Sequence, residues 1–206
     1  MKRALVIFLS LTSAILLFPQ EEENNVQFGF GVSLSSEYSV YNFYGFYEQS
    51  QSIETLPVSM ANFSIIIKSN KFRIEPNFGY YTTSQDYSDA GNSTERSTTN
   101  IRTGLVIAYN NTNIESMNLY YGIDIGLVLS SYSYTSNYSD QSNDDSKSDF
   151  FIGPAVGGEY LFNRYFSLGG EINLNYISIG HYDYEGDYSS WAISTRGVIY
   201  LRWYVN

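Results

Sequence analysis

Residues 119–129 read Leu-Tyr-Tyr-Gly-Ile-Asp-Ile-Gly-Leu-Val-Leu, and this stretch decides the fold. Every second residue from Leu119 to Leu129 is apolar or aromatic, and Gly122, Asp124 and Gly126 stand between them. A repeat of two residues is the period of a β-strand, whose side chains point alternately to its two faces. The stretch therefore predicts a long strand with one apolar face and one small or polar face.

The same alternation recurs in seven other stretches, at residues 26–34, 56–67, 72–80, 101–109, 152–160, 166–176 and 193–205. Within residues 56–67 the apolar phase shifts by one position, which predicts a β-bulge near Ala61 and Asn62. Beyond the N-terminal region, no stretch offers the ~20 consecutive apolar residues that a membrane-spanning helix needs. The sequence therefore predicts an all-β chain of eight antiparallel strands in up-and-down order.

The connections between these stretches alternate in length. The short connections are residues 69–70, 110–116 and 163–164. The long connections are residues 35–55, 82–99 and 130–148, and one connection of intermediate length comprises residues 180–190. In an up-and-down arrangement all long connections then lie at one end and all short ones at the other. This pattern is typical of a transmembrane β-barrel with short periplasmic turns and long outer loops.

The polar faces of the strands indicate which way the barrel is turned. They carry four basic and four acidic residues, namely Arg73, Glu75, Arg102, Asp124, Glu159, Glu171, Arg196 and Arg202. An enclosed interior must balance its charges, because an unpaired buried charge is strongly destabilising. We therefore expect apolar side chains toward lipid and an interior ion-pair network. In that network Arg196 and Arg202 should pair with Glu171 on the neighbouring strand, and Arg73 and Glu75 should join it across the lumen.

Composition and the N-terminal segment restrict the setting. The 206 residues carry a net charge of -10, one histidine and no cysteine, which disfavours nucleic-acid binding and excludes disulfides, thiol nucleophiles and an all-histidine zinc site. Lys2 and Arg3 precede an almost wholly apolar stretch at residues 4–17. We expect a cleaved signal peptide at residues 1–20 and a barrel domain at residues 21–206, with a retained N-terminal anchor helix as the alternative.

Three segments carry a family resemblance. They are Phe151-Ile-Gly-Pro-Ala-Val-Gly-Gly-Glu-Tyr-Leu-Phe162, Phe166-Ser-Leu-Gly-Gly-Glu-Ile-Asn-Leu-Asn-Tyr176 and Arg73-Ile-Glu-Pro-Asn-Phe-Gly-Tyr80. They resemble the small outer-membrane β-barrel family, the OmpA/OmpX-like eight-stranded group of Gram-negative envelopes, over residues 26–206. The resemblance implies location in the outer membrane, with outer-membrane lipid, lipopolysaccharide and the barrel-insertion machinery as partners. Such chains usually end in an aromatic residue, whereas Trp203-Tyr204-Val205 here precede Asn206.

The long connections are rich in Tyr, Ser and Asn and are strongly acidic, a composition typical of adaptable binding surfaces. The candidate recognition residues are Tyr41, Tyr44, Tyr47, Tyr134 and Tyr184. We expect a structural, surface-exposed monomer that presents these segments for adhesion or recognition to an unknown surface ligand. A barrel this narrow is no general porin.

Two alternatives remain open at this point. The first is a rim enzyme, a hydrolase or a lipid-modifying protein, in which His181 and nearby Asp183 act as a general base; we expect no enzyme. The second is a soluble lipid-binding barrel. We expect no cofactor and no metal, although Asp140, Asp144 and Asp145 stand close enough in sequence to share a Ca²⁺ ion.

Overall fold

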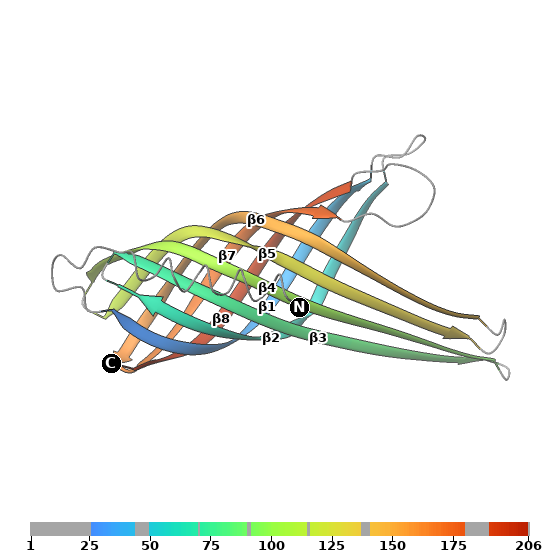
Figure 1. Cartoon of the computed structure of the whole chain (residues 1–206), viewed down its shortest axis with the longest axis horizontal. Coiled ribbons are helices and arrows are strands. Elements are labelled where there is room, and N and C mark those ends of the chain that lie inside the picture. Colours follow the sequence, from blue (N-terminus) through green and yellow to red (C-terminus); the bar gives the residue numbers. More distant parts are fainter. Residues whose placement is uncertain are drawn as a thin grey trace, which may run out of the picture.

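The computed structural model describes residues 26–43, 50–69, 71–89, 92–114, 116–136, 141–179 and 190–205. They form eight antiparallel strands that close into a barrel in sequence order, as Figure 1 shows. The expected all-β, eight-stranded, up-and-down architecture is confirmed. The expected signal peptide at residues 1–20 lies outside the described residues and stays a prediction.

The strands are long and tilted, and each pairs with its neighbour in the chain. Their bounds are β1 (Gln27–Phe43), β2 (Ser50–Lys68), β3 (Phe72–Asp89), β4 (Asn92–Ile114), β5 (Met117–Ser136), β6 (Gln141–Asn163), β7 (Phe166–Ile179) and β8 (Ser190–Val205). β1 pairs with β8 from Phe28 opposite Val205 to Asn42 opposite Trp191, which closes the cylinder. Within the described ranges, no helix has the length and apolarity to span a membrane.

The apolar side chains point away from the barrel axis. Ile199, Ile172 and Val156 are 69%, 64% and 60% exposed, whereas Arg73 is 0% exposed and Arg202 is 1% exposed. An outward apolar band around a charged interior is stable only where the exterior meets lipid. The fold is therefore a transmembrane β-barrel, and the soluble lipid-binding barrel is not supported.

Aromatic side chains form a girdle around the end of the barrel that carries the short turns. One run of ring contacts joins Phe72, Tyr109 and Tyr121, and another joins Tyr160, Phe162, Phe166, Trp203 and Phe30. At the other end Tyr176 stacks on Trp191, with ring centroids 6.1 Å apart. Aromatic rings at both ends are typical of the two interfaces of a membrane, where amphipathic rings are favoured.

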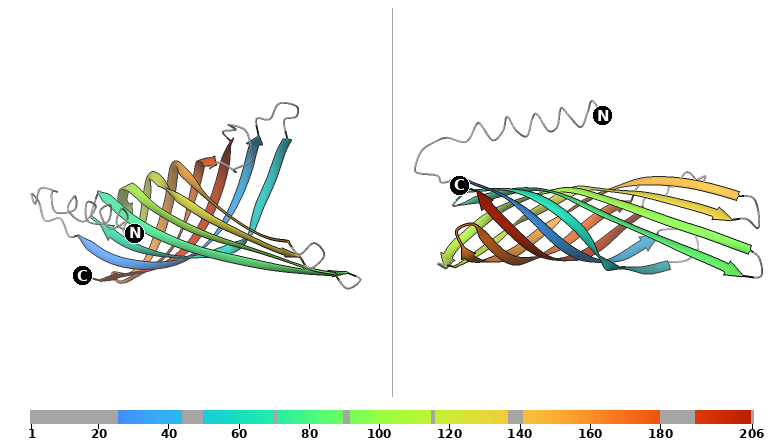
Figure 2. Two further views of the ribbon diagram at one scale, coloured as in Figure 1. Left: turned by 45° about the vertical axis from the view of Figure 1, so that its right-hand side comes forward. Right: turned by 90° about the horizontal axis from the view of Figure 1, so that it is seen from below.

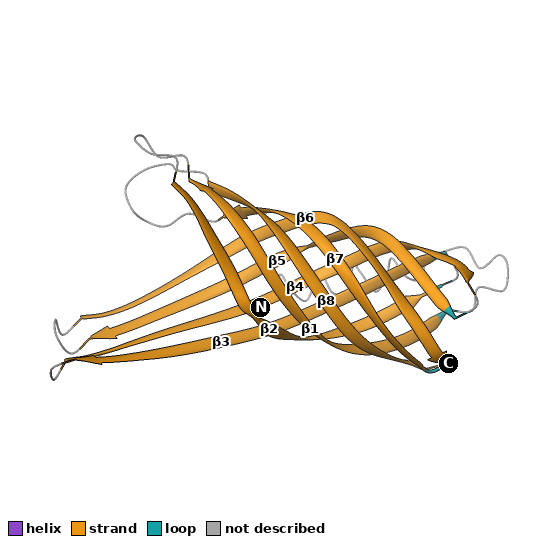
Figure 3. Cartoon of the chain, turned by 180° about the vertical axis from the view of Figure 1, so that it is seen from behind, coloured by secondary structure: helices purple, strands orange, loops and turns teal. Residues whose placement is uncertain are grey.

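Four strands run on beyond the barrel as a separate sheet. β2 stops pairing with β3 at Ala61 opposite Tyr80, and β6 stops pairing with β7 at Phe150 opposite Ser178. Above these points β3, β4, β5 and β6 stay paired with one another and diverge from the arm in which β1 pairs with β2 on one side and with β8 on the other (Figures 2 and 3). We call this part, residues 81–89, 92–100, 130–136 and 141–149, the projecting sheet.

Two expectations are corrected by these strands. Three stretches expected as long loops are mostly paired strand in their described parts, namely residues 35–55, 82–99 and 130–148. The hydrogen-bonded pairing of the strands continues there, beyond the point where the apolar alternation ends. The bulge expected near Ala61 and Asn62 lies slightly earlier in β2, because both residues pair regularly and the register shift falls at residues 57–59, opposite Ser36. The misplacement arose from Met60, an apolar residue that points inward and is only 8% exposed.

Candidate functional site: a filled lumen and a projecting sheet

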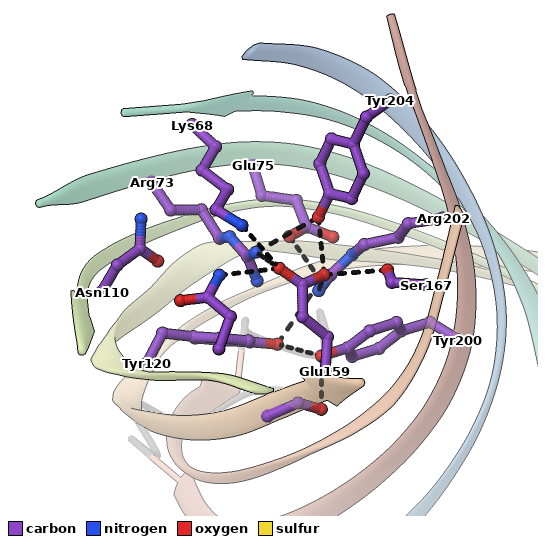
Figure 4. A network of polar contacts seen from close by, with 12 residues as sticks. Lys68, Arg73, Glu75, Asn110, Tyr120, Glu159, Ser167, Tyr200, Arg202 and Tyr204 are labelled. Carbon is purple, nitrogen blue, oxygen red and sulfur yellow. Dashed lines mark hydrogen bonds and ion pairs between the residues drawn. The ribbon is translucent and has the colours of Figure 1, made fainter. Parts of the chain in front are cut away.

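One carboxylate, that of Glu159 on β6, lies at the centre of the lumen near the short turns. It is 1% exposed and accepts hydrogen bonds from side chains of five other strands (Figure 4). The donors are Lys68 at 3.1 Å, Arg73, Asn118 at 2.8 Å, Ser167 at 3.0 Å, Arg202 at 3.4 Å and Tyr204 at 2.6 Å. The two oxygens of a carboxylate offer about four lone-pair sites, so the six donors share them, three at each oxygen.

Tyrosine rings lie beside Glu159 and stack against the guanidinium groups of the arginines. The guanidinium of Arg202 lies 3.4 Å from the ring centroid of Tyr200, and that of Arg73 lies 4.2 Å from the ring centroid of Tyr120. The Tyr120 hydroxyl donates to Glu171 at 2.7 Å. Cation–π stacking and hydrogen bonds to charge together compensate part of the desolvation that a buried ion suffers.

The predicted pairing of Glu171 is wrong. Glu171 accepts hydrogen bonds from Tyr120 and Asn173 and lies within 4.0 Å of no basic nitrogen among the described residues. Arg202 instead bonds to Glu75 across the lumen, and Arg196 bonds to Asn62 at 3.1 Å. In a narrow barrel the long side chain of an arginine reaches the opposite wall. Its partner therefore need not be the acidic residue on the adjacent strand.

A second cluster lies nearer the projecting sheet. Arg102 bonds to Asp124 at 3.0 Å and to Glu37 at 3.3 Å, and its guanidinium lies 3.5 Å from the ring centroid of Phe151. The Arg196 guanidinium approaches the same Asp124 carboxylate at 3.9 Å. These contacts join β1, β4, β5 and β8 just below the point where the strands diverge.

The two clusters are each electrically balanced. The turn-side cluster holds Lys68, Arg73 and Arg202 with Glu75, Glu159 and Glu171, and the loop-side cluster holds Arg102 and Arg196 with Glu37 and Asp124. The sequence reasoning missed Lys68 and Glu37, which lie at the ends of their apolar runs. Continuing the two-residue period by one step in β2 and by two steps in β1, past Ser35, would have assigned both side chains to the lumen.

A cavity of about 20 Å³ lies between the clusters, lined by residues that include Glu75, Asn77, Glu171, Arg196 and Tyr200. That volume accommodates about one water molecule. The cavity therefore offers no route for a solute through this part of the barrel.

The lumen-side face of the projecting sheet continues the inward face of the strands. Its cross-strand rows place Tyr81 opposite Asn100, Thr98 opposite Tyr132, and Arg96 opposite Tyr134. The Arg96 guanidinium lies 5.6 Å from the ring centroid of Tyr134, and Ser130 donates to Asn100 at 2.7 Å. This face combines flat rings, amide and hydroxyl groups and a guanidinium, which are the groups that bind polar surface ligands.

Of the five predicted recognition residues, the structure describes both backbone and side chain for one. Tyr134 lies on the lumen-side face of the projecting sheet, together with Tyr81, which the sequence reasoning did not single out. The Tyr41 side chain and residues Tyr44, Tyr47 and Tyr184 lie outside the described residues, as does His181.

The metal prediction has the same limit. The described side chains contain no group of three His, Cys, Asp or Glu residues arranged to hold a metal ion. Two of the three acids considered for Ca²⁺, Asp140 and Asp145, have side chains outside the described set.

Comparison with known proteins shows that the fold of this chain is similar to that of several solved structures. No family profile and no curated protein matches the chain. Among solved structures, the chain is similar to the Neisserial surface protein A, with 15% identity, a TM-score of 0.44 and coverage of 82% of this chain and 96% of that one. It is also similar to the attachment invasion locus protein Ail of Yersinia pestis, with 15% identity, a TM-score of 0.42 and coverage of 84% and 97%. The outer membrane protein AlkL gives 11% identity, a TM-score of 0.49 and coverage of 92% and 95%.

At these identities the similarities assign no function, and the class of the protein follows from its own geometry. A closed barrel of eight tilted strands has an apolar exterior, aromatic rings at both ends and a charged, filled interior. Short turns at one end and long projections at the other complete the architecture of bacterial outer-membrane barrels. The protein is an eight-stranded outer-membrane β-barrel.

Proposed function

We propose that this barrel is a structural, monomeric surface protein that holds the projecting sheet above the outer membrane and offers its lumen-side face for recognition. The observation that carries the proposal is the alignment of Tyr81, Tyr132 and Tyr134 with Arg96 on one face of four paired strands. A sheet fixes the spacing of these groups, so a ligand meets them with little loss of conformational freedom.

The filled lumen supports a presenting role over a transporting one. Both ion-pair clusters lie inside the barrel with their arginines at most 3% exposed. Removing a partner from a buried pair is costly, so the network resists the opening that passage of a solute would need. The interior therefore supports a closed barrel as the base of the projecting sheet.

The chemistry of the lumen-side face favours a polar ligand with flat apolar patches. Tyr132 is 38% exposed, so part of its ring is free for contact, and tyrosine gives large contact area for only two rotatable bonds. The chain as a whole carries a net charge of -10, which disfavours strongly anionic ligands. Neutral oligosaccharides and cationic peptides are the classes that this surface fits.

The test uses intact cells that carry the full chain. Bead-bound neutral oligosaccharides, sulfated oligosaccharides and lysine-rich peptides are each offered to cells with the native protein and to cells with Y81A/Y132A/Y134A. We expect native cells to retain a neutral or cationic probe, and the triple variant to lose about tenfold or more of that binding, since tyrosines often dominate such contacts.

The matched control is T135A, which changes a residue of β5 that points to the other side of the sheet. This variant should bind as the native protein does, and both variants should show native heat-modifiable migration in gels. Equal binding by native cells and the tyrosine variant for every probe would refute the proposed recognition face.

A further inference from the structure

The opposite face of the projecting sheet, which continues the lipid-facing side of the strands, changes composition within one row. The last apolar row above the barrel contains Tyr80, Ile101 and Leu129, which lie opposite one another in register. Two residues further along each strand the side chains are hydroxylic. We call this surface the lipid-side face, and the abrupt change marks the outer edge of the hydrocarbon layer.

Cross-strand register divides the lipid-side face into rows. The first row holds Thr82, Thr99, Ser131 and Ser146, the second holds Ser84, Ser97, Ser133 and Asp144, and the third begins with Asp86, Glu95 and Thr135. The first row is thus entirely hydroxylic and the second is hydroxylic except at Asp144. The described part of this face carries no Lys or Arg, so it offers no cation for a phosphate.

The position of these rows decides what they meet. Two residues of a strand rise about 7 Å along its axis, and a tilt near 40° reduces this to roughly 5 Å of height per row. The first two rows therefore lie within about 10 Å of the hydrocarbon edge, at the depth of lipid headgroups. Because the rows continue the lipid-facing surface without a break, their nearest neighbours are the headgroups of the same leaflet.

The chemistry of the face selects among headgroups. A serine or threonine hydroxyl both donates and accepts a hydrogen bond, as a sugar hydroxyl does, whereas a phosphate would call for the basic residues that these rows lack. Thr82 and Thr99 already lie 3.2 Å apart through their hydroxyl oxygens, so the short side chains form a flat and continuous polar surface. Acidic side chains are concentrated further out, in the third row.

We propose that the first two rows of the lipid-side face bind the uncharged sugar headgroups of glycolipids that surround the barrel. The contact is a set of hydrogen bonds between the short hydroxyls of β3, β4 and β5 and the hydroxyls of the sugar. It covers the outer side of the projecting sheet and leaves the lumen-side face free for other ligands.

The test measures amide hydrogen exchange of the projecting strands in the full chain, refolded into vesicles of phosphatidylcholine with or without digalactosyldiacylglycerol. The sugar lipid should slow exchange of the native strands about threefold to tenfold, the range that corresponds to one or two net hydrogen bonds. S84A/S97A/S133A, which removes the hydroxyls of the second row, should show clearly less of this slowing. T83A/T94A/T98A, which removes three hydroxyls from the lumen-side face, should keep it.

Each other result overturns the proposal. It fails if the sugar lipid leaves exchange of the native strands unchanged, or if S84A/S97A/S133A is slowed as much as the native protein. Equal slowing by phosphatidylglycerol would assign the effect to anionic headgroups instead of sugars. Equal slowing by free digalactose in phosphatidylcholine vesicles would show that the face binds soluble sugars and not the lipid.

Discussion

At the scale of single residues, Glu159 determines how the lumen holds together. Its carboxylate is the common acceptor for Lys68, Arg73 and Arg202, which come from three different strands. A buried ion pair contributes little net stability compared with a well-packed apolar core. Removing one partner is different, because the charges left behind have no other compensation.

E159A should therefore destabilise the barrel by about 3–5 kcal/mol, the usual cost of breaking a buried ion pair. The free energy of unfolding is measured by urea denaturation in phospholipid vesicles. E95A is the control, since Glu95 is exposed on the projecting sheet, and it should change the free energy by no more than about 0.5 kcal/mol. Equal effects of the two substitutions would show that Glu159 is not the centre of the network.

Glycines give a second test at this scale. A Cβ atom on Gly157 would collide with the ring of Tyr120, whereas a Cβ atom on Gly197 would meet nothing within 4 Å. G157A should lose about 1–3 kcal/mol of stability through overpacking. G197A should be neutral or gain about 0.5–1 kcal/mol, because alanine loses less backbone entropy than glycine on folding. The same urea denaturation measures both, and a stability loss for G197A as large as for G157A would contradict the packing described here.

At the scale of elements, the barrel strands and the projecting sheet are separable. Among the described residues, the projecting part is held by pairing among β3, β4, β5 and β6, since the pairing of β2 with β3 ends at Tyr80 and the pairing of β7 with β6 ends at Phe150. The spanning part is held by closure of all eight strands and by the interior clusters. Shortening the projection should therefore leave the barrel intact.

Replacing residues 83–98 with Asn-Gly tests this, because Thr82 and Thr99 lie directly opposite each other and Asn-Gly suits a two-residue hairpin. The shortened protein should keep heat-modifiable gel migration and a native unfolding midpoint. The same turn placed between Asn77 and Gly104 removes membrane-spanning rows and should abolish the folded band. Loss of the folded band in the first variant would mean that the projection is part of the folding unit.

The strands also show which features of the fold could be predicted from the sequence. Strand number and facing could be predicted, because alternation reports directly on which side chains meet lipid. Strand length could not, since Ser, Thr and Asn in the projecting sheet lack apolar contrast and resemble loop composition. Tyr81 was missed as a surface group because it directly follows Tyr80 at the end of an alternating run, and nothing in the sequence marks where the strand leaves the membrane.

The partners in the interior ion pairs could not be predicted from the sequence. The eight charged residues were assigned to the polar faces, and each is buried in the structure. Which charge meets which depends on the tilt and stagger of the strands, which place residues far apart in the chain at one height. Arg202 therefore meets Glu75 across 127 positions of sequence instead of Glu171 on the adjacent strand.

At the scale of the whole molecule, the filled interior makes a prediction about conduction. The cavity of about 20 Å³ between the clusters is far too small for a hydrated ion. Insertion of the purified protein into a planar lipid bilayer should give no steady conductance above the leak of the membrane. Regular conductance steps, absent from a control preparation that was unfolded by heat, would contradict a closed lumen.

The central feature of the molecule is the orientation of its strands, with apolar side chains in lipid and charges inside. A carbene reagent that partitions into the bilayer tests it on the native chain, with labelled positions located by mass spectrometry. We predict label on Ile172, Leu174 and Ile199 and none on Glu159 or Arg202. Label on those two charged residues, with Ile172 and Ile199 unmodified, would contradict the account.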